Sequence, residues 1–229
     1  MVSAIIVAAG QGIRMKGTMR KQYLDLSGRP VLAHSIMTFD SCSLVDEILL
    51  VIPKEDVEYC QNKILSLLDL NNQINLVCGG DKRQDSVYNG LKATTKNTET
   101  VVIHDGVRPF IQPEDLKQCI LVSKKYGACI LGTPASDTLK RADKSNIIET
   151  TLSRENIWLA QTPQAFKYDL ILKAHETARR DGYVGTDDAS LVERMGEDVK
   201  IINGGKFNIK ITKKEDLPIA KAMFDAGLI

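Results

Sequence analysis

Short apolar runs rich in β-branched residues alternate along this chain with longer segments of helical periodicity. The apolar runs predict strands at residues 2–7, 47–52, 74–78, 100–104 and 128–133. The segments between them predict helices at about 30–40, about 54–70, from Asp81 onward, and at 113–126. Asp81 followed by Gln84 predicts a capping box at the start of the third helix. This strand and helix rhythm indicates an α/β fold, with a mostly parallel sheet covered by helices on both faces.

The pattern changes at residues 137–154, where two strand-like segments surround a polar turn. These segments carry few large apolar residues, so packing them onto their own domain would bury little surface. We therefore expect a β-hairpin arm that protrudes from a single domain of residues 1–229. We also expect this arm to pair with a second subunit and give a homodimer, the alternative being an ordinary edge hairpin on the same sheet.

Composition narrows the choice of partners and compartment. The 30 basic residues balance 29 acidic ones, so the net charge of +1 does not support a nucleic-acid partner. The five cysteines are scattered and include no C-x-x-C pair, which predicts reduced core residues rather than disulfides or a zinc site. No apolar stretch approaches membrane-spanning length, and the chain enters its first strand directly after Met1. We expect a cytoplasmic protein without a membrane partner.

The first predicted strand ends in a loop of small residues that also carries two cations, Arg14 and Lys21. Backbone N–H groups of such a loop can turn toward phosphate oxygens, and the two cations would add formal charge. The loop does not fit a P-loop, because Thr18 stands where a lysine is required. It does not fit a dinucleotide fingerprint either, because Met15 stands where a small residue is required. It therefore predicts a site for the phosphate tail of a nucleotide, with a plain turn as the alternative, and its small residues are Ala8, Ala9, Gly10 and Gly12.

Further polar clusters follow other predicted strands, at the sheet edge where open α/β folds bind ligands. Paired glycines before Ser86 would let a nucleotide approach closely, and the Ser86 hydroxyl could hydrogen-bond to a base edge. Asp105 could hold a magnesium ion whose other positions are filled by phosphate oxygens. Lys210 would add another cation. Each residue also has an ordinary structural reading as a cap, a surface ion pair or a solvated charge, and His104 alone would make a poor metal site.

Taken together, these motifs resemble the 2-C-methyl-D-erythritol 4-phosphate cytidylyltransferase family over nearly the whole chain. More broadly the sequence is similar to nucleotidyltransferases of the glycosyltransferase-A type, which implies a Rossmann-like sheet. The matching runs are Ala8-Ala9-Gly10-x-Gly12-x-Arg14-Met15, Lys21-Gln22-Tyr23-Leu24, Gly79-Gly80-x-x-Arg83-x-x-Ser86-Val87, His104-Asp105-Gly106-x-Arg108-Pro109, Asp137-Thr138-x-Lys140, Gln161-Thr162-Pro163-Gln164-x-Phe166, Thr186-Asp187-Asp188-Ala189 and Asn208-Ile209-Lys210-Ile211-Thr212.

The resemblance implies cytidylyl transfer from CTP to a polyol phosphate, 2-C-methyl-D-erythritol 4-phosphate, with Mg²⁺ as cofactor. Arg14 and Lys21 would stabilise the reacting α-phosphate, and Asp105 would bind the metal. The implied nucleotide-binding residues are Ala8, Ala9, Gly10, Gly12, Gly80, Asp81 and Ser86. The implied acceptor-binding residues are Arg108, Thr138, Thr162, Thr186 and Lys210, with Arg154 reaching the acceptor phosphate from the partner's arm.

Three alternatives are open at this point. Ribitol 5-phosphate cytidylyltransferase shares the loop, the Asp105 motif and the arm, although Lys140 and the Ala8-Ala9 pair favour the methylerythritol enzyme. A non-catalytic sensor of CTP could keep the base pocket, but it would not need both Arg14 and Lys21. A dehydrogenase is a weak third alternative, because the dinucleotide fingerprint fails.

Overall fold

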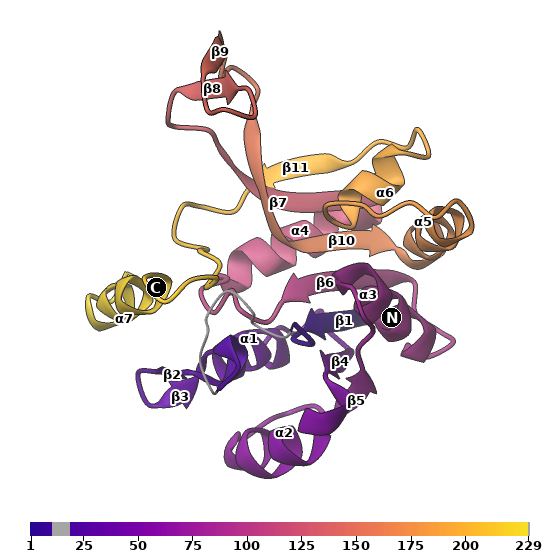
Figure 1. Cartoon of the computed structure of the whole chain (residues 1–229). Coiled ribbons are helices and arrows are strands. Elements are labelled where there is room, and N and C mark those ends of the chain that lie inside the picture. Colours follow the sequence, from indigo (N-terminus) through magenta and orange to yellow (C-terminus); the bar gives the residue numbers. More distant parts are fainter. Residues whose placement is uncertain (11–18, 229) are drawn as a thin grey trace.

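The computed structural model describes residues 1–10 and 19–228, and its centre is a seven-stranded sheet in the order β11-β7-β10-β6-β1-β4-β5. All neighbouring strands are parallel except β10, which runs antiparallel to both β6 and β7. Figure 1 shows helices on both sides of this sheet, which confirms the predicted fold class. The strands are β1 (Val2–Val7), β4 (Glu47–Ile52), β5 (Ile74–Cys78), β6 (Thr100–Asp105), β7 (Ala128–Pro134), β10 (Trp158–Lys167) and β11 (Lys200–Asn203).

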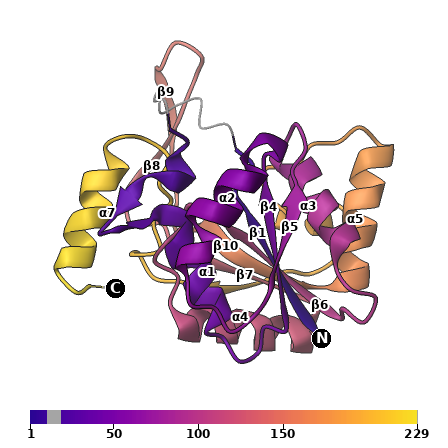
Figure 2. The same ribbon diagram turned by 90° about the horizontal axis from the view of Figure 1, so that it is seen from below.

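Two apolar clusters cover the two faces of the sheet, and β1 contributes alternate residues to each. Ala4 and Ile6 join the cluster that includes α1 and α4, whereas Ile5 and Val7 join the cluster that includes α3 and α5. Figure 2 shows α3 and α5 together on one side of the molecule. The helices are α1 (Val31–Asp40), α2 (Val57–Lys63), α3 (Arg83–Ala93), α4 (Pro113–Tyr126), α5 (Tyr168–Arg180), α6 (Ala189–Glu193) and α7 (Asp216–Asp225).

Some local expectations are wrong. The single helix expected over about 54–70 is instead three short elements, η3 (Lys54–Asp56), α2 and η4 (Leu65–Leu67), and the break falls at Ile64. Ile64 leaves helical geometry, with φ −122° and ψ −67°, while its side chain is buried in the core. Burial of this side chain therefore outweighs continuation of the helix.

The expected capping box of Asp81 and Gln84 is also wrong. Helix α3 begins at Arg83, and the backbone N–H of Lys82 donates to the Asp85 carboxylate at 3.3 Å. Gln84 instead contacts the 183–185 segment, donating to the Tyr183 carbonyl and accepting from the Gly185 N–H.

One further expectation needs correction, and two strands were not located. Among the cysteines, Cys78 is exposed rather than a core residue, although the other four are buried and all five are free. The sequence analysis gives no range for strands β10 and β11, because the residues of β10 were interpreted as a binding motif and as packing positions.

The segment at 137–154 forms β8 (Leu139–Ala142) and β9 (Ile148–Leu152), which pair with each other antiparallel. They make a separate two-stranded sheet, and Figure 1 shows it extending away from the body of the molecule. Every residue of β9 is exposed. A second small sheet, β2 (Asp25–Leu26) with β3 (Arg29–Pro30), follows the short η2 helix (Lys21–Tyr23). Within residues 1–10 and 19–228, no helix has the length and apolar character that a membrane crossing requires.

Candidate functional site

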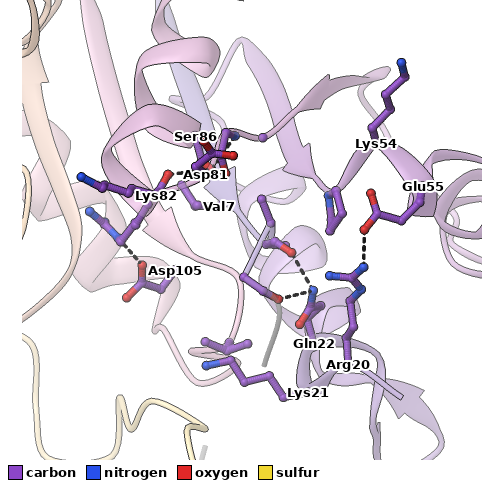
Figure 3. A pocket seen from close by; sticks show the side chains of 18 of the residues that line it. Val7, Arg20, Lys21, Gln22, Lys54, Glu55, Asp81, Lys82, Ser86 and Asp105 are labelled. Carbon is purple, nitrogen blue, oxygen red and sulfur yellow. Dashed lines mark hydrogen bonds and ion pairs between the residues drawn. The ribbon is translucent and has the colours of Figure 1, made fainter. Parts of the chain in front are cut away.

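A cavity of about 420 Å³ opens at the carboxyl ends of β1, β4, β5 and β6. Figure 3 shows Lys21 and Asp105 among its lining side chains. This is the edge at which an open α/β sheet binds ligands. The structure thus brings together nine of the predicted residues, which are Ala8, Ala9, Gly10, Lys21, Gly80, Asp81, Ser86, Asp105 and Lys210.

A second cavity of about 220 Å³ adjoins the first. Three side chains line both cavities, namely Arg83, Asp105 and Lys210. The second cavity also gathers three residues predicted to bind the acceptor, which are Arg108, Thr162 and Thr186. Two ligands placed in these two cavities would therefore meet at one charged wall.

The remaining predicted residues are placed differently. Within the described part of the chain, Thr138 and Arg154 line neither of these two cavities. Both lie at the base of the hairpin arm and are exposed, and Arg154 donates to the Ser136 carbonyl. Gly12 and Arg14 lie outside the described residues. Their assignments stay predictions.

Close backbone packing shapes the first cavity. A Cβ atom added to Gly79 would lie 2.3 Å from the Cβ of Ala9, so only glycine allows the two loops to approach this closely. Ser86 is buried, and its hydroxyl lies 3.1 Å from the backbone N–H of Gly80 and 3.1 Å from the Lys82 carbonyl. Ser86 therefore braces the turn that carries Gly80 and Asp81.

Gln22 holds Lys21 at the cavity. Its side-chain amide donates to the Ala8 carbonyl at 2.7 Å and approaches the Gly10 carbonyl at 3.3 Å. Gln22 is buried, so these bonds are shielded from water. The amide thereby ties the η2 segment to the loop that follows β1.

Asp105 is surrounded by cations. Its Oδ1 accepts from Arg83 Nε at 2.9 Å, its Oδ2 lies 2.7 Å from Lys210 Nζ, and Arg108 Nε is 3.9 Å away. Arg83 also reaches Asp188 at 2.8 Å, so this guanidinium bridges two buried carboxylates. Burial alone would raise the pKa of Asp105, but the charges of Arg83 and Lys210 hold that pKa well below its usual range. Asp105 is therefore ionised at neutral pH.

A buried hydrogen-bond chain orients Thr162 behind Asp105. His104 Nε2 lies 3.1 Å from the Arg108 carbonyl, which can only accept, so Nε2 carries the proton. His104 Nδ1 then accepts from the Thr162 hydroxyl at 3.1 Å, and Thr162 Oγ1 accepts from the Asp105 N–H at 3.0 Å. Burial lowers the pKa of His104 to about 4, which keeps the ring neutral at pH 7.

The side chains at the cavity could hold magnesium only together with the phosphate oxygens of a bound ligand. In the described part of the chain, no three His, Cys, Asp or Glu residues form a group that could hold a metal. Asp105 nevertheless offers a carboxylate at the cavity wall, and Mg²⁺ is commonly held by one or two carboxylates together with substrate phosphates. The fit requires Lys210 to give up the Oδ2 atom that it now contacts.

Sequence reasoning assigned no role to three residues that build the site, Arg83, Gln22 and Gln164. Gln164 is buried, donates to Asp187 at 2.7 Å, and accepts from the N–H groups of Asp188 and Ala189. It therefore fixes the segment that carries Thr186. All three residues lie inside the motifs quoted above, so their place in those motifs was the sequence signal that could have identified them.

Comparison with known proteins gives a consistent result. Residues 2–226 match the family described as "IspD: 2-C-methyl-D-erythritol 4-phosphate cytidylyltransferase". Proteins of that name from Pelotomaculum thermopropionicum and Caldanaerobacter subterraneus are 44% and 46% identical to this chain. The alignments cover 98% and 96% of this chain, and 94% and 97% of those proteins.

Solved structures agree with the sequence comparison. The 4-diphosphocytidyl-2C-methyl-D-erythritol synthase of Anaerococcus prevotii superposes with a TM-score of 0.87 at 38% identity, over 98% of this chain and 96% of that one. The 2-C-methyl-D-erythritol 4-phosphate cytidylyltransferase of Francisella tularensis gives a TM-score of 0.80 at 33% identity, over 96% and 98% of the two chains.

Proposed function

Because this chain belongs to the 2-C-methyl-D-erythritol 4-phosphate cytidylyltransferase family, we propose that its larger cavity binds CTP and its smaller cavity binds the acceptor phosphate. The chain is an enzyme that transfers a cytidylyl group from CTP to 2-C-methyl-D-erythritol 4-phosphate in the non-mevalonate isoprenoid route. The products are the CDP-alcohol and pyrophosphate. The relatives' shared name does not favour the ribitol enzyme or a non-catalytic sensor.

The observation that carries this assignment of the cavities is their common wall. Arg83, Asp105 and Lys210 line both, so an α-phosphate in one cavity and an acceptor phosphate in the other would face each other across a short distance. Bringing two polyanions together requires fixed positive charge, which the cations around this wall supply.

The chemistry needs no protein base. The second pKa of a phosphate monoester is about 6, so the acceptor phosphate is largely a dianion near neutrality. One of its oxygens forms a bond to the α-phosphorus, and the bond from that phosphorus to the β-phosphate oxygen breaks. The electron pair leaves with pyrophosphate. The protein therefore acts by positioning the reactants and by stabilising negative charge.

The roles follow from where each side chain lies. Lys21 would stabilise charge on the α-phosphate from the wall of the larger cavity, and Arg14 would join it by its place in the motif. Arg108, Thr162, Thr186 and Lys210 would hold the acceptor in the smaller cavity. Enzymes of this family generally use a divalent metal. Mg²⁺ held by Asp105 and the triphosphate would neutralise charge on the departing pyrophosphate.

The hairpin is proposed as a dimer arm. The described residues place exposed apolar side chains on it and next to it, including Ile147, Ile148 and Leu159. Clustered exposed apolar side chains are typical of a surface that another chain covers. Thr138 and Arg154 lie at the base of this arm, and in the described part of the chain they line neither of the two cavities, which supports a contribution of Arg154 to the partner's acceptor site. Four buried, unpaired cysteines are compatible with a reducing cytoplasm as the place of action.

A direct assay tests the function. The purified protein is incubated with CTP and Mg²⁺, together with either 2-C-methyl-D-erythritol 4-phosphate or ribitol 5-phosphate, while pyrophosphate release is followed. We expect release with the methylerythritol phosphate and little with the ribitol phosphate. Release only with the ribitol phosphate would transfer the assignment to the ribitol enzyme, and binding of CTP without release would support the sensor.

A further inference from the structure

Arg20 links two segments of the nucleotide cavity through paired charges. It directly precedes η2, the short helix that begins with Lys21. Its Nη2 lies 2.5 Å from Glu55 Oε1 and its Nε lies 2.9 Å from Asp56 Oδ2. Both carboxylates belong to η3, and Figure 3 shows the Arg20 side chain directed toward Glu55.

Tyr23, two residues after Lys21, also contacts the Asp56 carboxylate. Its hydroxyl donates to Asp56 Oδ2 at 2.9 Å, and its ring packs against Tyr59 with centroids 5.1 Å apart. Asp56 thus receives one bond from the residue before Lys21 and one from the residue two positions after it. We refer to Arg20, Tyr23, Glu55 and Asp56 as the Asp56 cluster.

The backbone of Lys21 is therefore fixed by its neighbours. Gln22 ties it to the loop after β1, and the Asp56 cluster ties it to η3. Loss of the cluster would remove the tie to η3, whereas the Gln22 bond to the loop after β1 would stay. An ammonium group that must meet a reacting phosphate needs a defined origin for its side chain, since a displacement of about 1 Å can cost on the order of 100-fold in rate.

We propose that Arg20 is a positioning residue for cytidylyl transfer: its bridge to Asp56 and Glu55 sets where Lys21 enters the nucleotide cavity. This inference rests on the proposed function, because Lys21 matters only if the cavity holds the reacting triphosphate. We expect the ion pair with Asp56 to contribute more to the positioning of Lys21 than the ion pair with Glu55. The Glu55 side chain is 65% exposed and is screened by water and salt, whereas the Asp56 side chain is 16% exposed.

The alternative role for Arg20 is direct contact with the nucleotide, because Arg20 also lines the cavity. That contact would have to compete with two carboxylates that already engage its Nε and Nη2 atoms. A positioning residue and a ligand-binding residue differ in what their removal changes. Loss of positioning lowers kcat, whereas loss of a ligand contact made throughout the reaction raises KM for CTP.

Variants that remove one charge but keep a polar side chain test the proposal. Arg20→Gln, Asp56→Asn and Glu55→Gln each remove one charge, and the amide oxygen that Asp56→Asn introduces can still accept the Tyr23 hydroxyl bond. Glu58→Gln on α2 is the matched control, because it removes an exposed acidic charge outside the cavity lining. We expect Arg20→Gln and Asp56→Asn to lower kcat by on the order of tenfold or more while KM for CTP changes little. Glu55→Gln should have a smaller effect, and the Arg20→Gln/Asp56→Asn double variant should be no worse than either single variant.

Hydrogen exchange gives a second readout that needs no turnover. The Tyr23 and Leu24 amides close the η2 turn on the carbonyls of Arg20 and Lys21. Both amides should exchange several-fold faster in Arg20→Gln and Asp56→Asn than in the wild type or in Glu58→Gln.

The possible outcomes separate the proposals. Unchanged exchange together with a raised KM for CTP would assign Arg20 to the nucleotide and overturn the positioning role. Normal turnover in an Arg20→Gln variant of an active enzyme would refute the inference and leave the proposed function intact. A wild-type protein that releases no pyrophosphate would remove the proposed function and the positioning role with it.

Discussion

Lys210 Nζ lies 2.7 Å from Oδ2 of Asp105, at the wall shared by the two cavities. Lys210 follows β11 and Asp105 ends β6, so the fold brings the two together from distant parts of the sequence. This ion pair leaves Lys210 beside both expected ligands. A metal that binds Asp105 Oδ2, or a phosphate that binds Lys210, must therefore break the ion pair.

Replacing Lys210 with methionine should weaken acceptor binding. The variant removes a cation from the smaller cavity and keeps most of the side-chain volume. A hydrogen bond to a charged group contributes about 1.5–3 kcal/mol, so KM for the acceptor should rise by roughly 10- to 100-fold. Steady-state kinetics with saturating CTP measure this. Lys206→Met, which changes an exposed lysine in the same segment, is the control. An equal loss in both variants would contradict the assignment.

Replacing Lys21 with alanine should affect turnover rather than binding. If its ammonium stabilises charge that develops on the α-phosphate, kcat should fall by on the order of 100- to 1,000-fold while the affinity for CTP changes little. Single-turnover kinetics and calorimetric titration with CTP separate these quantities. Lys63→Ala, on the exposed end of α2, should behave as wild type. A tenfold weaker affinity with normal kcat would place Lys21 among ground-state contacts instead.

Replacing Gly79 with alanine should distort the larger cavity and weaken CTP binding. The new Cβ would lie 2.3 Å from Ala9 Cβ and 3.0 Å from Ser86 Oγ, so the loops after β1 and β5 must separate. Such overpacking costs typically about 1–3 kcal/mol of unfolding free energy. Gly10→Ala is a matched control for stability, because its added Cβ meets nothing within 4 Å. Urea unfolding of both variants and CTP titration of Gly79→Ala test this, and unchanged values for Gly79→Ala would count against the tight approach.

The sequence located five of the seven strands of the sheet, all except β10 and β11, and nine of the residues that line the larger cavity. Buried strands such as 2–7 and 47–52 are apolar apart from Ser3 and Glu47, and parallel strands place their carboxyl ends at one edge. Local periodicity did not reveal the break at Ile64, because that break depends on tertiary burial of one side chain. Pairings such as Arg83 with Asp188, or Gln164 with Asp187, join residues far apart in sequence, so only the fold discloses them.

The neutral His104 ring should make stability depend on pH. Burial lowers the pKa of His104 to about 4 from 6.5, so the unfolded chain takes up a proton at a higher pH than the folded chain. The corresponding stability is present above pH 6.5 and is lost as pH falls from 6.5 toward 4, by about 3 kcal/mol in all. Urea unfolding at pH 7 and pH 5 measures this. His104→Asn should be less stable at pH 7 but less sensitive to pH over this range. Half-buried His34, whose pKa burial also lowers, makes His34→Asn a useful comparison.

A charged residue on the arm should separate the subunits. Ile148 on β9 is 59% exposed, and its replacement by aspartate would leave the fold of the body unaffected while placing a charge in the proposed interface. Sedimentation velocity should show a dimer for the wild type and a monomer for Ile148→Asp at micromolar concentration, with similar circular dichroism. A monomeric wild type would refute the arm interface directly.

Co-expression of two inactive variants should then show which subunit's site Arg154 serves. If Arg154 acts in the partner's site, a dimer of one Arg154→Ala chain and one Lys21→Ala chain contains one site with both residues intact. Random assembly would make half of the dimers mixed, so about a quarter of wild-type activity should return. If Arg154 serves its own chain, every site in the mixed dimer lacks one residue and no activity returns. The arm therefore contributes to catalysis in trans only if the mixture is more active than either variant alone.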